Sequence, residues 1–243
     1  MAHVSSPHPR RSTLALVLAC ALWLTGTAAA QVAAGDRLVD EGRFEEAVAA
    51  YETAVAANPD DARAHYQLAR AAVYLADDLP ADAAADKEAW FARAADAAEL
   101  AVELAPDDPD AHFEVARALG RLAQFRGVLQ SLNLAGRVSD ALDAALELDP
   151  EHAASWHARA LFHRDVPWIA GGRAGQVIPS FERAIASEPD VITHRLELAR
   201  VLIDRDDPAA AREQLELAVT FTARTYHDRL DLEAARELLA SLP

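Results

Sequence analysis

The sequence predicts an all-α protein, a superhelical solenoid of about five helical hairpins followed by a C-terminal capping helix. Two observations lead to this fold class. The 243-residue chain is 52% hydrophobic, and its apolar residues are mostly alanine and leucine, which favour helix over a pleated sheet. A stretch with helical periodicity, Gly42 to Pro59, returns in degenerate form in every later part of the chain. The repetition makes this stretch the unit of the fold.

The first 30 residues differ in kind from the rest. Arg10 and Arg11 form a basic start, residues 14–24 form a short apolar run, and residues 28–30 are all alanine. This order is typical of an export signal with a small-residue cleavage site. We therefore expect residues 1–30 to be a signal peptide and residues 31–243 to be one repeat domain.

Two other interpretations of the N-terminus stay open. The apolar run could serve as an uncleaved membrane anchor, or Val17-Leu18-Ala19-Cys20 could be a lipoprotein signal in which Cys20 receives the lipid. In every case we expect an exported protein of a bacterial periplasm or cell envelope. Any attachment to a membrane would be through the N-terminus.

Charge and cysteine content exclude several functions. The formal net charge is −16 at pH 7, and no basic face is visible, so the sequence argues against nucleic-acid binding. The acidity is more typical of solubility or salt adaptation than of a specific cationic partner. Cys20 is the only cysteine, so no disulfide within the chain and no thiolate metal site is expected.

The first unit, over about residues 31–59, is predicted to be a helical hairpin. Its second helix runs from Phe44 to Ala57 and ends before Pro59. Small and aromatic residues recur at a characteristic spacing, namely Gly35, Ala47, Tyr51, Ala54 and Pro59. On these five positions the chain resembles the tetratricopeptide repeat, a pair of antiparallel helices with small residues where the helices cross.

Four further units and a cap follow. The same pattern predicts units over about residues 60–106, 107–150, 151–189 and 190–223, and a capping helix over 224–243 that shields the last apolar face. The alanines that close the units, Ala54, Ala101, Ala145, Ala184 and Ala218, lie 47, 44, 39 and 34 residues apart. The first three intervals exceed the standard repeat of about 34 residues. We expect the extra residues between the two helices of a unit, as a cap or lid on one edge, or else as loops that merely lengthen the helices.

Two of these longer stretches point to one branch of the repeat family. They are Leu119 to Gly127 in the third unit and Val166 to Gly172 in the fourth. With them the chain resembles the T-components of tripartite (TRAP) substrate-uptake transporters and the regulators of microtubule dynamics. The resemblance implies a periplasmic solenoid with a central apolar channel or groove that works beside a substrate-binding protein. The composition of the fourth-unit insert, a Pro-Trp followed by Gly-Gly, independently favours a lid made of Val166, Pro167, Trp168, Gly171 and Gly172.

Aligning the units places aromatic and basic residues in register on the first helices, which line the concave surface of such repeats. One position holds Tyr66, Phe113, His157 and Leu196, and the position one turn later holds Arg70, Arg117, Leu161 and Arg200. Arginines beside aromatic rings suit a ligand with an apolar body and a carboxylate, or a partner's acidic segment. The alternative is that each arginine pairs with a carboxylate of a neighbouring unit.

No pattern predicts catalysis, a cofactor or a metal site. His152, His157 and His163 lack the four-residue spacing of helical zinc ligands, and Gly171 to Gly175 lacks the Lys and Ser/Thr of a phosphate-binding loop. We therefore expect a non-enzymatic binding protein, most concretely a T-component-like accessory of a periplasmic uptake system that holds a small apolar or amphipathic ligand. The alternative is a general protein–protein interaction scaffold of the cell envelope that takes a peptide.

Overall fold

The computed structural model describes residues 28–127 and 131–242, and the repeated element in these ranges is the helical hairpin. The first hairpin pairs a helix over residues 28–41 with α2 (Phe44–Ala57). The signal predicted over residues 1–30 lies outside the described residues except for its last three, and Cys20 lies outside as well.

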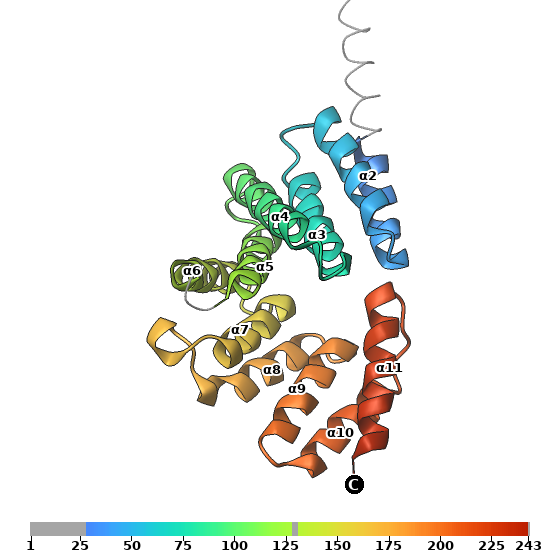
Figure 1. Cartoon of the computed structure of the whole chain (residues 1–243), viewed down its shortest axis with the longest axis vertical. Coiled ribbons are helices and arrows are strands. Elements are labelled where there is room, and N and C mark those ends of the chain that lie inside the picture. Colours follow the sequence, from blue (N-terminus) through green and yellow to red (C-terminus); the bar gives the residue numbers. More distant parts are fainter. Residues whose placement is uncertain (1–27, 128–130, 243) are drawn as a thin grey trace, which may run out of the picture.

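Further helices follow α2 along the described chain. They are α3 (Ala62–Asp78), α4 (Ala84–Leu104), α5 (Pro109–Arg126), α6 (Leu132–Leu148), α7 (Ala153–Asp165), α8 (Val177–Ser187), α9 (Ile192–Asp204), α10 (Pro208–Ala218) and α11 (Tyr226–Ser241). Each helix packs against the next, and α5 also contacts α3 and α7, the first helices of the neighbouring units. Figure 1 shows the pairs following a curved path that brings one end of α11 next to α2. The predicted fold class, an all-α superhelix of five hairpins and a cap, is confirmed.

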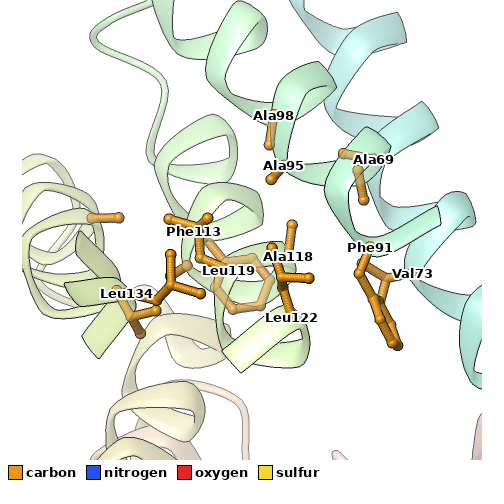
Figure 2. Close-up of a cluster of buried hydrophobic side chains, with 14 of the residues drawn as sticks. Ala69, Val73, Phe91, Ala95, Ala98, Phe113, Ala118, Leu119, Leu122 and Leu134 are labelled. Carbon is orange, nitrogen blue, oxygen red and sulfur yellow. The ribbon is translucent and has the colours of Figure 1, made fainter. Parts of the chain in front are cut away.

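Buried apolar side chains of the described residues form a core of several clusters. Its largest cluster, part of which is drawn in Figure 2, includes Val73, Phe91, Phe113, Leu119 and Leu134, contributed by α3, α4, α5 and α6. Alanines fill the places where helices come closest. The repeat-closing alanines, Ala54, Ala101, Ala145, Ala184 and Ala218, are all 0% exposed.

Side-chain caps set the start of several helices. Asp61, Asp108 and Asp207 each accept a hydrogen bond from a backbone N–H in the first turn of the helix that follows. Thr225 and Asp228 form a reciprocal capping box at the start of α11. The acidic composition of the chain thus has a local structural use at helix N-termini, where negative charge is favourable.

The three long units use their extra residues in different ways. In the second and third units they lengthen helices, so α4 has 21 residues and α5 has 18. In the fourth unit they form two short 3₁₀ turns, η2 (Trp168–Ala170) and η3 (Ala174–Gln176), between α7 and α8. The fourth unit therefore has a non-helical insert of the kind expected for a lid, whereas the other two follow the alternative interpretation of longer helices.

Replacement of Gly35 tests the close helix crossing of the first unit. A Cβ at Gly35 would lie 2.5 Å from the ring of Tyr51, which is itself 0% exposed. We expect Gly35→Ala to lower the free energy of unfolding by about 1–3 kcal/mol, measured by urea denaturation, because the ring must shift in a packed core. The matched control is Gly136→Ala in α6, where a Cβ meets nothing within 4 Å. This change should instead stabilise by up to about 1 kcal/mol, and equal effects of the two substitutions would contradict the interpretation.

Candidate functional site

An open cavity of about 680 Å³ lies on the inner side of the superhelix. The first helices of consecutive units supply much of its wall, since residues of α3, α5, α7 and α9 all line it, and α6 and the insert of the fourth unit complete it. Its volume falls within the range of roughly 300–1,000 Å³ that small-molecule sites occupy. The cavity is therefore the best-formed candidate site in the described part of the chain.

Most of the cavity wall is apolar and made of small side chains. Leu132 and Val138 of α6 and Leu161 and Phe162 of α7 supply the larger apolar surfaces. Between them lie alanines of four segments, namely Ala116, Ala123, Ala135, Ala154, Ala158 and Ala170. A wall of this composition favours the apolar body of a ligand and offers it no hydrogen bond.

A basic cluster adjoins this apolar wall. Glu114 is 0% exposed and lies 2.9 Å from the Nε of Arg70 and 3.4 Å from the Nε of Arg117. Arg117 also donates a 3.0 Å hydrogen bond to the Tyr74 hydroxyl and lies over the Phe113 ring. Because two guanidinium groups share one carboxylate, the cluster keeps one positive charge in a protein whose net charge is −16.

A pair of histidines forms the second polar feature of the cavity. His157 of α7 and His194 of α9 both line it, and their Nδ1 atoms are 3.0 Å apart, so one ring donates and the other accepts. Burial lowers the pKa of His157 to about 4, with a further contribution from Arg117 and Arg164. Burial lowers the pKa of His194 to about 3. Both rings are therefore neutral near pH 7, and in the described residues the buried Nε2 of His194 has no hydrogen-bond partner.

The insert of the fourth unit forms one side of the cavity mouth. Val166 and Pro167 line the cavity, and the turn is closed by two glycines. Gly171 has φ of +102°, which favours glycine, and a Cβ on Gly172 would lie 1.6 Å from the Val166 carbonyl oxygen. The Gly-Gly pair is thus required by the tight return of the chain.

The structure brings together only part of the predicted groove. Phe113, Arg117 and His157 line the cavity, whereas Tyr66, Arg70 and Arg200 do not.

Each of the other three predicted residues has a different environment. Tyr66 is buried beside Ala101 and Ala111, and Arg70 is held by Glu114. Arg200 pairs with Glu197 of its own helix. The pairing of Arg70 with Glu114 matches the alternative interpretation, in which each arginine pairs with a carboxylate of a neighbouring unit.

Several cavity residues were absent from the sequence prediction. Tyr74 and His194 lie off the two aligned register positions, and Thr193 donates its hydroxyl hydrogen to Asp231 of α11. Glu114 carried no signal, because a buried glutamate cannot be distinguished by pattern from the many exposed ones. Only the equivalent position of Arg70 and Arg117 in successive units could have indicated a shared carboxylate.

The described residues contain neither a metal-binding cluster nor a membrane-spanning helix. No three histidine, cysteine or carboxylate side chains within residues 28–127 and 131–242 converge as a metal ion would require. Over the same ranges, no helix combines the length and apolar character needed to cross a membrane.

Fold and cavity together define a helical repeat protein of the tetratricopeptide class, an interaction-scaffold fold. The chain belongs to the regulator of microtubule dynamics protein 1-3 family, whose family model matches residues 31–169. Regulator of microtubule dynamics protein 1 of Caenorhabditis elegans is 27% identical over 125 residues, which cover 45% of this chain. The match spans 55% of that relative, so the chain corresponds to about half of its length.

Solved structures place the fold in the same class. A tetratricopeptide-repeat protein of Thermus thermophilus superimposes with a TM-score of 0.69 at 20% identity, over 86% of this chain and 99% of that one. Pseudomonas aeruginosa pilF superimposes with a TM-score of 0.53 at 18% identity, over 90% of this chain and 89% of that one. At these identities the likeness concerns the fold alone.

Removal of the Glu114 charge tests the basic cluster. We expect Glu114→Gln to lower the free energy of unfolding by about 3 kcal/mol, because it leaves two partly buried guanidinium groups without their anion. The control is Glu52→Gln, which removes an exposed ion pair with Arg93 between two units and should cost less than about 1 kcal/mol. Urea denaturation of both variants measures the difference, and similar small effects would show that Glu114 is not an anchoring charge.

The histidine pair predicts a pH dependence of stability. Because the folded-state pKa values lie below the ordinary value of about 6.5, the unfolded chain binds more protons between pH 6.5 and 4. The contribution of the two neutral histidines to the free energy of unfolding is therefore fully present above about pH 6.5. It falls as the pH drops, by up to about 1.4 kcal/mol per pH unit for each histidine. The double variant His157→Gln/His194→Gln should show a shallower slope of unfolding free energy between pH 6.5 and 5, and an unchanged slope would contradict the burial argument.

Proposed function

We propose that this protein is a non-enzymatic binding protein that holds a small amphipathic ligand in the cavity. The observation that carries the proposal is a 680 Å³ cavity with an apolar wall and the surplus positive charge of the Arg70–Glu114–Arg117 cluster beside it. Pockets of this kind, mostly apolar with a few polar groups, are the usual form of small-molecule sites.

The two kinds of wall set the chemistry of the ligand. The alanine and leucine surfaces take an apolar body, and Arg117 takes an acidic group, since a guanidinium pairs well with a carboxylate or a similar anion. The neutral ring of His157 adds a hydrogen bond to an oxygen of the ligand. The ligand is thus an acid with a sizeable apolar part.

We further propose that the protein is exported and acts as an accessory of a periplasmic uptake system, in contact with a substrate-binding protein. The support is the signal-like sequence of residues 1–30 and the resemblance of the two longer stretches to T-components. In this role the cavity would keep a ligand out of water between the substrate-binding protein and the next step of uptake.

A second candidate function is a general interaction scaffold, and one observation favours it. Trp168 is 84% exposed and Ile169 is 67% exposed, in the same turn whose Pro167 and Ala170 line the cavity. Large apolar side chains this exposed at the rim of a cavity suit a protein partner. If the protein is a scaffold that binds its partner through Trp168 and Ile169, Trp168→Ser should remove partner binding while small-molecule binding stays unchanged.

Two fluorescent probes with different head groups test the ligand chemistry. 1-Anilinonaphthalene-8-sulfonate has an apolar body and an anionic sulfonate, whereas N-phenyl-1-naphthylamine is uncharged. We expect Arg117→Gln to weaken binding of the sulfonate probe by about 10- to 100-fold, because a hydrogen bond to a charged group contributes about 1.5–3 kcal/mol. Binding of the uncharged probe should change little.

A cavity-filling variant tests whether the probes bind in the cavity, independently of the charge of Arg117. Ala158→Phe places a large ring in the cavity wall and should weaken both probes, while Ala209→Phe, on the exposed side of α10, should weaken neither. Thermal unfolding of each variant shows whether it is folded. Retention of both probes by folded Ala158→Phe would overturn the proposed function.

A further inference from the structure

The two ends of the superhelix meet through four aromatic rings. Phe44 begins α2, Tyr74 lies in α3, and Tyr226 and His227 are the first residues of α11. The Phe44 ring lies 5.6 Å from Tyr226, edge to face, and 5.5 Å from His227. The His227 ring is 4.3 Å from Tyr74. Figure 1 shows this junction, where one end of α11 approaches α2 and the curved chain closes on itself.

Local backbone geometry is adapted to this junction. Gly42, in the turn before α2, has φ of +81°, and the Tyr226 ring occupies the space of its missing side chain, since a Cβ would lie 2.5 Å from that ring. The capping box of Thr225 and Asp228 fixes the first turn of α11, which presents both aromatic residues. The junction is thus specified by residues of the first turn of the last helix and by a glycine of the first unit.

Charges at the junction oppose closure. Burial raises the pKa of Asp40, and the nearby carboxylates of Asp36 and Asp228 raise it further, so acidic groups of the first and last elements face one another. Burial also lowers the pKa of His227, around which lie Asp231 and Asp228 of α11, Asp77 of α3 and Arg117 of α5. Stacking of the rings therefore holds the ends together against like charges, and aromatic pairs contribute only about 0.5–1.5 kcal/mol each beyond their burial.

The ring cluster is connected directly to the cavity. Tyr74 is one of its four rings and also lines the cavity, and its hydroxyl accepts the hydrogen bond from Arg117. A movement of α11 away from Phe44 and Tyr74 would therefore remove the ring that packs against Tyr74, a residue of the cavity wall and the partner of Arg117.

We propose that Phe44, Tyr74, Tyr226 and His227 form a latch that closes the superhelix, and that opening of the latch loosens Tyr74 in the cavity wall and speeds the exchange of ligand. Closure stands on the contacts alone, whereas the gating of ligand rests on the proposed function.

Distance measurements between spin labels test the closure. The full-length chain with Cys20→Ser carries labels at Ala56→Cys on α2 and Ala240→Cys on α11, both exposed positions. We expect one narrow distance distribution near neutral pH, and a broader distribution shifted to longer distances in Tyr226→Ala/His227→Ala. The matched control is Leu230→Ala, which removes a 46% exposed side chain one turn further along α11 and should leave the distribution unchanged.

Acidification provides a second test of the same contact. Between pH 7.5 and 5.5 the proton that His227 takes up disfavours its stacked position, so part of the population should open. His227→Phe keeps a ring and removes the titration, and it should stay closed over this range. Far-UV circular dichroism checks that each variant is folded. A folded double-alanine variant with the wild-type distribution would overturn the latch.

Dissociation kinetics of 1-anilinonaphthalene-8-sulfonate test the gating. We expect release to be at least about 5-fold faster in the double-alanine variant than in the wild type and the Leu230→Ala control. An opened superhelix with unchanged release would overturn gating and leave closure standing. Absence of probe binding to the wild type would instead overturn the proposed function and the gating that rests on it.

Discussion

The close approach of neighbouring helices at alanines is the constraint on which the rest of the structure depends. One alanine closes each unit, and all five are inaccessible to solvent. An alanine at this place lets the second helix of one unit contact the first helix of the next at short distance, because no larger side chain separates the backbones. The same step repeated five times gives the superhelix its curvature, and the curvature places the first helices of successive units around a common interior.

Charge is organised by the same architecture. Several ion pairs join neighbouring units at exposed positions, such as Arg93 with Glu52 and Arg137 with Glu99, and add little to stability. Glu114 is different because it is fully buried and serves arginines of two units. Its position on α5 also orients Arg117 toward the cavity, so one buried carboxylate links unit-to-unit packing to the chemistry of the candidate site.

The sequence was sufficient for the fold and for part of the site, for a physical reason. Helical period and the recurrence of alanines are local properties, and they predicted the five hairpins and the cap. Phe113, Arg117 and His157 were found because equivalent positions of a repeat face the same interior. His194 was missed because the alignment of the units selected Leu196 in α9. The cavity is lined instead by residues of the first turn of α9, which include His194. Contact between Phe44 and Tyr226 could not be predicted, since it depends on rotations accumulated over five units.

The cavity itself argues for binding. Six alanines line it where leucine or phenylalanine would fill the space, although an unfilled apolar space lowers stability through lost dispersion contacts. Elsewhere the same sequence packs tightly, as Tyr51 against Gly35 and Phe181 in the fourth unit show. A chain that fills its core at these places, yet keeps small side chains around 680 Å³ beside a buried charge cluster, has a wall suited to a guest molecule. The ring contacts between the first and last elements reach this wall through Tyr74, which lines the cavity and packs against His227.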